Sequence, residues 1–383
     1  MVEQTAIGTS ASARWDEHAA WRGPVRRAEL PGGQQVWVVT GYDEVAALLA
    51  DPRLSLDKKH ASGGYAGFAL PPALDRNLLN MDGDEHGRIR KLAGPAFSRR
   101  SSGSLRAAVA RTAEEVFAAL PESGSETIDL LAELCVPVPA MVIGELLGIP
   151  ADLHSRLRDA ATAMVTFDAA SKASGQRLVA AIGWLTATFA SLVHSKRVNP
   201  GDDLLSGWVQ ARDVEETLTE DELVSLAFLM MLAGLENAAH MCSNMIAALL
   251  TSDDAPETLA AWPTSRGLLM ERANPLPFAI RRFAVTDLIL GDHTISTGDT
   301  VLLTLFGADS DPARNGRPSL MFGRGPHYCL GAQAADLVID AVVPQLFVRH
   351  PRAQLAVAES ALEYRTSWRS HGLVTLPVLL TPH

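Results

Sequence analysis

The sequence has few cysteines and no excess of positive charge. Each of these features excludes certain classes of protein. Its three cysteines, Cys135, Cys242 and Cys329, lie far apart among 383 residues and form no Cys-x-x-Cys pair. Neither a disulfide framework nor a zinc site is therefore expected, and a reducing cytoplasm suits the chain. The formal net charge of −11 argues against nucleic-acid binding, because proteins that bind DNA or RNA carry a basic surface.

Long apolar stretches are also missing. Residues 1–14 lack the apolar centre of a signal peptide, and no uninterrupted run of about eighteen apolar residues occurs elsewhere. We therefore expect a cytoplasmic protein without a membrane anchor. With 47% hydrophobic and 20% charged residues, the chain has ample material for a core. No internal repeat or low-complexity linker marks a boundary, so residues 1–383 are predicted to form a single domain.

One glycine-rich stretch dominates the sequence. Residues 322–331 read Phe-Gly-Arg-Gly-Pro-His-Tyr-Cys-Leu-Gly and precede an apolar run that begins at Ala332. Glycine permits tight turns and close backbone approach, so that backbone N–H groups can point at the sulfur of Cys329. A position at the start of a helix further favours a negative sulfur. Cys329 is therefore a candidate thiolate ligand for a metal.

The pattern Phe-Gly-x-Gly-x-His-x-Cys-x-Gly resembles the haem-binding signature of the cytochrome P-450 family. The resemblance implies that Cys329 is the ligand of the iron of haem b and that four neighbours help to bind the cofactor: Phe322, Gly323, His327 and Gly331. A thiolate ligand pushes electron density toward dioxygen and favours O–O cleavage. A buried cysteine in a glycine-rich turn before a helix is the structural alternative.

The resemblance covers most of the chain, from about Val36 to Val378. It implies a mainly α-helical fold with small antiparallel β-sheets, an α+β arrangement in which one long central helix lies over a buried haem. The residue pattern itself predicts a strand at 34–40, a helix at 43–50, a loop at 55–79, helices between 153 and 198, strands between 277 and 303 and a last hairpin at 362–380.

A second block opens a helix after Asn80. His86 and Arg90 are four residues apart, so they share one helical face. His-x-x-x-Arg matches the family's pattern for binding a haem propionate, and the Arg-x-Ala at Arg282 matches a further propionate position. Guanidinium groups suit carboxylates because they bind them in a bidentate manner. We expect these three residues and His327 to bind the propionates; a solvated basic face is the alternative for the helix.

A third block lies inside a helix predicted at 218–250. Its residues Ala-Gly-Leu-Glu-Asn match the family's Ala-Gly-x-Glu-Thr beside the iron without a gap, which gives four candidate catalytic residues: Ala233, Gly234, Glu236 and Asn237. The small residues leave room for an iron ligand. Asn237 stands where the family has threonine. A hydroxyl donates and accepts through one rotating atom, whereas an amide does not exchange these roles. Proton delivery is therefore altered, unless Asn237 is a structural amide that joins two helices.

Two further departures concern the wall behind the cysteine loop. The family has a Glu-x-x-Arg motif, but here Glu271 and Arg272 are adjacent and face different directions. The segment from Asp311 to Met321 is shorter than in the family and contains no Pro-x-x-Phe. We therefore expect the family's ion-pair network to be absent. Replacing buried ion pairs by packed apolar groups can be neutral, so the absence does not imply loss of haem.

These features predict a soluble bacterial haem-thiolate monooxygenase that oxidises a small organic molecule of secondary metabolism, as in antibiotic biosynthesis. By resemblance it is a monomer that receives electrons from a ferredoxin or flavodoxin-type donor and its reductase. Five basic residues predict a positive patch for an acidic donor: Arg88, Lys91, Arg99, Arg100 and Arg324.

Two alternative functions stay open. A haem-thiolate enzyme with a non-standard reaction, such as oxidative coupling, ring closure, dehydration or peroxide use, would explain the missing threonine at Asn237. A non-catalytic auxiliary protein of a partner enzyme would explain the missing ion-pair network. The identity of the substrate is not encoded in any motif, because fold resemblance does not fix a reaction.

Overall fold

The computed structural model describes residues 5–6, 24–30, 33–64, 72–99, 102–121, 126–167, 171–215, 218–365 and 367–380. The chain divides into two compact units, each assembled from segments far apart in the sequence. Unit 1 comprises residues 1–90, 276–329 and 366–371, and unit 2 comprises residues 91–275, 330–365 and 372–383. The expectation of one domain over residues 1–383 stays a prediction.

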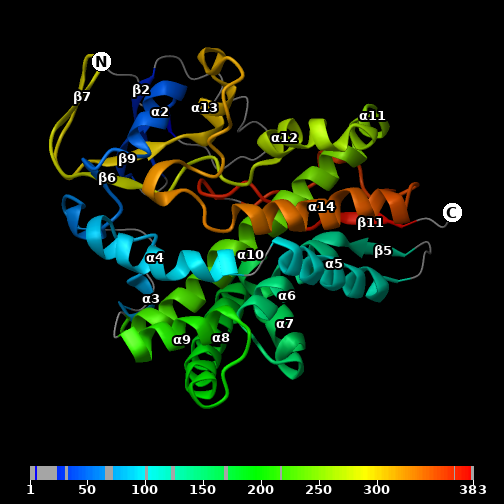
Figure 1. The fold of residues 1–383 in the computed structure, drawn as a ribbon. Helices are drawn as coiled ribbons and strands as arrows, with labels where there is room; N and C mark the ends of the chain where they lie inside the picture. The colour runs from blue at the N-terminus through cyan, green and yellow to red at the C-terminus, as the bar shows by residue number, and fades with distance from the viewer. Residues whose placement is uncertain are drawn as a thin grey trace. The chain divides into compact units, whose positions relative to one another are not determined.

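Unit 1 contains a six-stranded sheet in the order β1-β2-β3-β9-β6-β4, of which Figure 1 labels β2, β9 and β6. β1 pairs with β2 in parallel, and β3 pairs with β9 in parallel, while the remaining pairs are antiparallel. The sheet is therefore mixed rather than purely antiparallel. Its strands are β1 (Thr5–Ala6), β2 (Val25–Glu29), β3 (Gln35–Val39), β4 (Leu54–Ser55), β6 (Arg282–Ala284) and β9 (Thr300–Leu303).

The alternation of β-branched residues in β3 explains its place in the core of unit 1. Val39, Val301 and Ala284 are each fully buried in one apolar cluster, and Trp37 pairs in register with Val301. Burial of such side chains is the main favourable contribution to folding. The helix predicted after β3 is α2 (Tyr42–Leu48), which packs its buried face into the same cluster.

Short elements complete unit 1. The predicted loop at 55–79 is only partly irregular, because it contains a 3₁₀ turn and a short helix joined by an ion pair of 2.6 Å between Lys58 and Asp75. The elements are η1 (Lys58–His60), α3 (Pro72–Asp75), β7 (Leu288–Leu290), β8 (His293–Ile295), α13 (Leu305–Ser310), η4 (Pro312–Arg314) and η5 (Gly325–His327). β7 and β8 form a separate antiparallel hairpin.

Unit 2 is mainly helical, and its three-stranded antiparallel sheet has the order β10-β11-β5. The predicted mainly α-helical α+β class is thereby confirmed. The elements are α5 (Ser102–Ala119), β5 (Thr127–Asp129), η2 (Leu131–Cys135), α6 (Pro137–Leu146), η3 (Ala151–Leu153), α7 (His154–Val165), α8 (Lys172–Val198), α9 (Leu204–Glu215), α10 (Glu220–Leu250), α11 (Ala255–Ala260), α12 (Trp262–Ala273), α14 (Ala332–Arg349), β10 (Gln354–Leu355), η6 (Glu359–Ala361) and β11 (Pro377–Leu379). α4 (Gly83–Arg99) begins in unit 1 and ends in unit 2.

The long helix α10 forms as the sequence predicts. Thr219 and Glu222 make a capping box, in which each side chain accepts from the backbone N–H of the other. Acidic side chains in the first turn further complement the helix dipole. α10 contacts α6, α7, α8, α12 and α14. It is therefore the element around which unit 2 is packed (Figure 1).

Two helices, α8 and α10, are long and apolar enough to cross a membrane by length and composition alone. Neither helix is an uninterrupted apolar run, because polar or charged residues occur within both. The absence of a membrane anchor therefore stays a prediction. In α10 the most apolar window is 61% buried, and in α8 it is 28% buried. Core helices of water-soluble proteins meet the same criterion, so these two helices are weak evidence for a membrane span.

A polar network joins α12 to α14 within unit 2. Arg266 donates two hydrogen bonds to the Asp340 carboxylate, at 3.0 and 2.9 Å, and lies 3.3 Å from a carboxylate oxygen of Asp336. The Trp262 indole N–H donates to Asp340 at 3.0 Å. Trp262 and Arg266 are i and i+4 on one helix, and so are the two aspartates on the other. Geometry of this kind makes Asp340 the common acceptor.

We expect Asp340→Asn to lower the free energy of unfolding by about 1 kcal/mol, because it removes the charge that Arg266 and Trp262 share. Asp336→Asn is the matched control, since Asp336 has one longer contact with the same arginine. Chemical denaturation of the three proteins measures the difference. Equal losses from both variants would contradict the central role of Asp340.

Candidate active site

Cys329 lies at the end of a tight glycine loop in unit 1. Gly323 and Gly325 have φ of +74° and +72°, a region that side chains disfavour, and a Cβ on Gly325 would lie 2.7 Å from the Ala50 Cβ. The Cys329 N–H donates to the Phe322 carbonyl at 2.9 Å. Cys329 itself is exposed, so the loop presents the sulfur to its surroundings.

The other two cysteines are unsuited to be thiolate ligands. Both Cys135 and Cys242 are fully buried. Burial raises the pKa of Cys135 well above its usual value and raises the pKa of Cys242 to about 12. A thiol in such surroundings stays protonated and inert. Cys329 is therefore the one cysteine of the chain that is placed to bind a metal.

The predicted propionate-binding residues come together in unit 1. The rings of His86, on α4, and His327 lie 4.1 Å apart between their centroids. Arg90, one helical turn after His86, donates to the Tyr328 carbonyl beside Cys329. Arg282, on β6, is 3% exposed and donates to the Leu49 carbonyl at 3.2 Å. The alternative of a solvated basic face does not describe His86, which is also 3% exposed.

Asp82 holds part of this cluster in place, although no sequence motif pointed to it. Asp82 accepts from the His327 ring at 3.0 Å, from the Ser55 hydroxyl at 2.6 Å and from the Leu56 N–H at 2.6 Å. Burial favours a higher pKa for Asp82, but these three hydrogen bonds outweigh it and lower the pKa. Acids before a helix commonly serve its dipole, so the sequence contains no signal for this role.

Burial also sets the charge of the neighbouring side chains. It lowers the pKa of His86 to about 4, assisted by the neighbouring His327 and Arg90. It likewise lowers the pKa of Arg282 to about 10. Burial lowers the pKa of Arg90 too, while attraction to Cys329 opposes that change. A neutral imidazole and two guanidinium groups are therefore held near the cysteine loop.

Two atoms of this cluster have unmet hydrogen-bonding capacity. His86 Nε2 and Arg282 Nε are buried, and neither has a hydrogen-bond partner within the described part of the chain. Buried donors left without an acceptor are costly, and such atoms in a native protein call for a ligand. Carboxylates would satisfy them, and the nearby thiol would bind iron. The residues present thus fit a haem with its propionates.

The four candidate catalytic residues lie on α10 in unit 2. The Asn237 side-chain nitrogen donates to the Ala233 carbonyl at 3.1 Å, within the same helix. α10 continues without a break through this turn. A Cβ on Gly234 would lie 2.9 Å from the end of the Ile143 side chain. Asn237 therefore bonds its own helix here rather than joining two helices.

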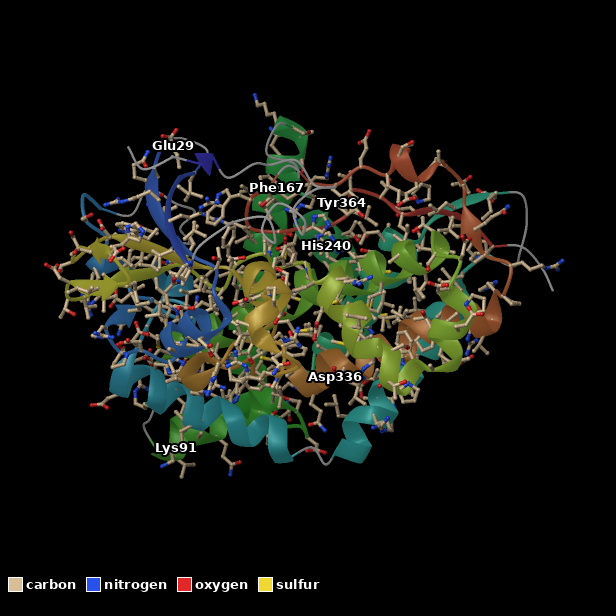
Figure 2. The ribbon with its side chains drawn as sticks, turned by 90° about the horizontal axis from the view of Figure 1, so that it is seen from above. Glu29, Lys91, Phe167, His240, Asp336 and Tyr364 are labelled. Atoms are coloured by element: carbon tan, nitrogen blue, oxygen red, sulfur yellow. The ribbon has the colours of Figure 1, made fainter. Side chains whose placement is uncertain are left out.

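Glu236 is held by a residue that the sequence analysis missed. Arg365 forms an ion pair with Glu236, and the same guanidinium nitrogen lies 3.4 Å from His240 Nε2. His240 is fully buried, and a Cβ on Gly372 would lie 2.3 Å from its ring. Figure 2 marks His240 and Tyr364, the neighbour of Arg365. The partners are more than a hundred residues apart, so no local pattern predicts them.

The remaining predicted residues are placed as follows. Phe322 is half-buried, and Gly331 is the N-cap residue of α14, which begins at Ala332. Arg88, Lys91 and Arg324 are described, with Lys91 and Arg324 exposed. The side chains of Arg99 and Arg100 lie outside the described residues. The positive patch therefore stays a prediction.

No protein-family model matches the chain, but individual proteins do. Vitamin D(3) 25-hydroxylase from Pseudonocardia autotrophica is 32% identical over 375 residues, which cover 94% of this chain and 91% of the relative. The structure of the ligand-free cytochrome P-450 monooxygenase TamI superposes with a TM-score of 0.84 at 33% identity and covers 99% of this chain and 94% of TamI.

A third similar structure is the cytochrome P-450 enzyme CxnD, described for C–S bond formation in chuangxinmycin biosynthesis. It superposes with a TM-score of 0.82 at 27% identity, over 100% of this chain and 98% of CxnD. Similarity of this extent and identity covers nearly the whole chain. The chain therefore belongs to the cytochrome P-450 family of haem-dependent monooxygenases and is an oxidoreductase.

Proposed function

We propose that the protein binds haem b through Cys329 and oxidises a small organic molecule of secondary metabolism. The observation that carries the proposal is the cluster in unit 1. It contains an exposed cysteine and two buried nitrogen atoms, His86 Nε2 and Arg282 Nε, that have no partner among the described residues. When bound, the haem supplies the reduction of dioxygen and the insertion of oxygen.

The chain's own residues bind and orient the cofactor. Arg90, Arg282 and neutral His86 would donate to its carboxylates. The two guanidinium groups suit this role because charge-assisted hydrogen bonds are strong and directional. Asp82 fixes the ring of His327 by accepting from its Nε2. The Cys329 N–H is committed to the Phe322 carbonyl, which fixes the backbone from which the sulfur projects.

Asn237 orients a water or a substrate hydroxyl and does not itself transfer a proton. Its nitrogen donates to the Ala233 carbonyl, so the amide presents its oxygen as an acceptor for a water or a substrate hydroxyl. Glu236, bound by Arg365, is a carboxylate with a fixed counter-ion. We infer that protons reach the reaction through a water or hydroxyl held at Asn237.

The partners and the cellular site follow from the same proposal. Members of this family oxidise small molecules with electrons from redox proteins, and here the donor is a ferredoxin or flavodoxin-type protein with its reductase. The protein acts as a monomer in the cytoplasm. Biosynthesis of a secondary metabolite, such as an antibiotic, is supported by the similarity to CxnD, which is described for chuangxinmycin biosynthesis.

A second candidate function is a non-standard oxidation that forms a bond without inserting oxygen. The observation that favours it is Asn237, an amide bonded to Ala233 where the family has a threonine hydroxyl. The similar protein CxnD is described for C–S bond formation. A non-catalytic auxiliary function has no such support, because the cysteine loop keeps the tight backbone that a ligand requires.

Replacing Cys329 tests the ligand. Cys329→Ser should abolish the strongly red-shifted carbon-monoxide band of the reduced protein, because a neutral hydroxyl cannot supply a soft anionic donor. Cys242→Ala is the control and should keep the band, since this thiol is buried and protonated. A Cys329→Ser protein with the wild-type band would refute the assignment.

Electron delivery tests the proposed donor. If an acidic ferredoxin binds a positive patch, the rate of electron transfer should fall several-fold as ionic strength rises, because salt screens charges beyond roughly 10 Å at 0.1 M. The charge reversals Lys91→Glu and Arg324→Glu should lower the rate at low salt only. Stopped-flow reduction measures both effects, and a rate independent of salt and of either variant would exclude the patch.

Variants of Asn237 separate the two candidate functions. For oxygen insertion, Asn237→Thr should raise the fraction of electrons recovered in product, since a hydroxyl both donates and accepts. Asn237→Ala should lower that fraction if the amide holds a water. Loss of the native product in Asn237→Thr, with a hydroxylated product in its place, would favour the non-standard reaction. Equal product yields from all three proteins would remove Asn237 from the mechanism.

A further inference from the structure

The segment before the cysteine loop contains a buried carboxylate that no motif of the family assigns. Asp309 lies near the end of α13, and its side chain is 1% exposed. Burying an ionised carboxylate is costly unless hydrogen bonds satisfy it. Its partners therefore show what the carboxylate fixes in place.

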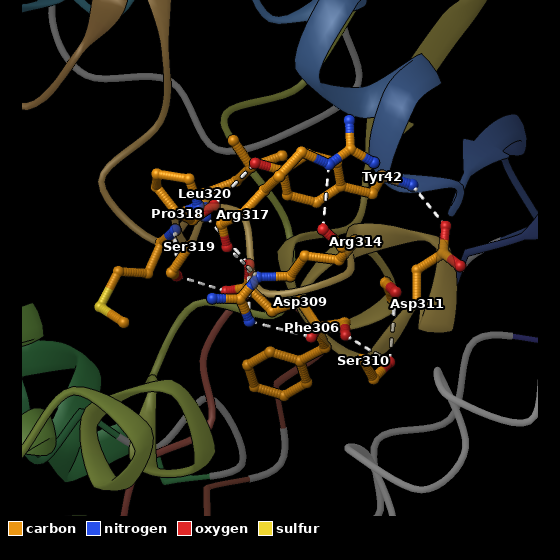
Figure 3. Close-up of polar contacts among 12 residues, drawn as sticks. Tyr42, Phe306, Asp309, Ser310, Asp311, Arg314, Arg317, Pro318, Ser319 and Leu320 are labelled. Carbon is orange, nitrogen blue, oxygen red and sulfur yellow. Dashed lines mark hydrogen bonds and ion pairs between the residues drawn. The ribbon is translucent and has the colours of Figure 1, made fainter. Parts of the chain in front are cut away.

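Asp309 binds the backbone that leads into the cysteine loop (Figure 3). One carboxylate oxygen accepts from the Ser319 hydroxyl at 2.6 Å, and the other accepts from the Leu320 N–H at 2.9 Å. Arg314 lies 3.9 Å from the second oxygen and also donates to the Asp309 carbonyl at 3.1 Å. Both oxygens thus have partners, and the nearby guanidinium balances their charge.

The hydrogen bonds continue from this carboxylate to Cys329. The Leu320 carbonyl, opposite the N–H that Asp309 binds, accepts from the Gly323 N–H at 2.8 Å. Two residues further along the chain, the Phe322 carbonyl accepts from the Cys329 N–H at 2.9 Å. A displacement of Leu320 would therefore shift the first turn of the loop and, through it, the backbone of the cysteine.

The other contacts of residues 311–318 are with α2. Arg317 forms an ion pair with Asp43 and lies over the Tyr42 ring, 4.2 Å from its centroid. The Tyr42 hydroxyl donates to the Pro318 carbonyl at 2.7 Å, and its N–H donates to Asp311 at 2.8 Å. These contacts are more exposed, and none of them reaches Leu320 directly.

We propose that Asp309 is a positioning residue that fixes the Cys329 loop, in place of the Glu-x-x-Arg motif that is missing from residues 267–275. The inference rests on the proposed haem-thiolate function, because a fixed loop matters for holding the sulfur toward iron. Asp309 acts on the sulfur through Leu320, Gly323 and Phe322 and touches neither cofactor nor substrate. The shortened segment 311–321 makes this possible by bringing Ser319 and Leu320 back to the end of α13.

The test compares two isosteric substitutions in neighbouring residues. Asp309→Asn leaves one acceptor oxygen for the Ser319 and Leu320 donors. The control Asp311→Asn leaves one acceptor oxygen for the Tyr42 and Ala313 N–H groups, which do not belong to the path to Cys329. The first measurement is hydrogen exchange of the peptide from Leu320 to Cys329. The second is the share of haem-bound protein that shows the thiolate-type carbon-monoxide band after reduction.

We expect exchange in that peptide to rise on the order of tenfold in Asp309→Asn, and the thiolate-type share to fall by about half or more. Asp311→Asn should change neither. Ser319→Ala, which removes one of the two bonds, should lie between wild type and Asp309→Asn in both measurements. Agreement of Asp309→Asn with wild type or with Asp311→Asn in either measurement would overturn the inference.

The two proposals fail in different ways. A wild-type protein without the thiolate-type band overturns the proposed function, and loop exchange in Asp309→Asn then decides the positioning role alone. A wild-type protein with the band, together with an unchanged loop in Asp309→Asn, overturns the positioning role and leaves the proposed function standing. A denaturation curve for each variant accounts for any general loss of stability.

Discussion

The candidate site of unit 1 depends on hydrogen bonds that satisfy a few partly or fully buried carboxylates. Half-buried Asp82 is the clearest case, because its carboxylate binds two other segments, residues 55–56 and the loop at His327. Removal of such an acceptor would leave several donors without partners, at a cost of about 1–3 kcal/mol for each buried group. Asp309, which precedes the loop, likewise accepts hydrogen bonds from a serine hydroxyl and a backbone N–H, those of Ser319 and Leu320. Two carboxylates therefore hold the cysteine loop, Asp82 through the His327 ring and Asp309 through the Leu320 backbone.

Much of the fold could be predicted where the signal is local. The capping box at Thr219 and Glu222 marks the start of α10, and β-branched alternation marks β3. The pairing of the strands is harder to predict from the sequence. β3 pairs in parallel with β9, more than 250 residues later in the chain, which makes the sheet mixed. Such a pairing depends on which apolar faces meet in the core, and sequence periodicity does not contain that information.

The candidate site shows the same division. The loop around Cys329 and the helix face of His86 and Arg90 are short patterns, and the structure places these residues together. Asp82, Asp309 and Arg365 were missed, because each acts on a partner that is distant in the sequence or belongs to no known motif. Residues 267–275 contain no Glu-x-x-Arg motif, which is visible in the sequence. The sequence does not show that Asp309, just before the shortened segment, is buried beside Arg314 within that segment.

Gly372 constrains how this enzyme can be altered. Its backbone packs against the ring of fully buried His240, and even a methyl group there would lie 2.3 Å from a ring atom. Glycine is required at position 372 because a side chain would not fit there, and not because of a left-handed backbone conformation. Positions 372 and 240 should therefore vary together among natural relatives. A variant library that diversifies the end of the chain would have to keep Gly372. If Gly372 were replaced, His240 would have to be replaced by a smaller residue as well, and the contact of His240 with Arg365 would be lost.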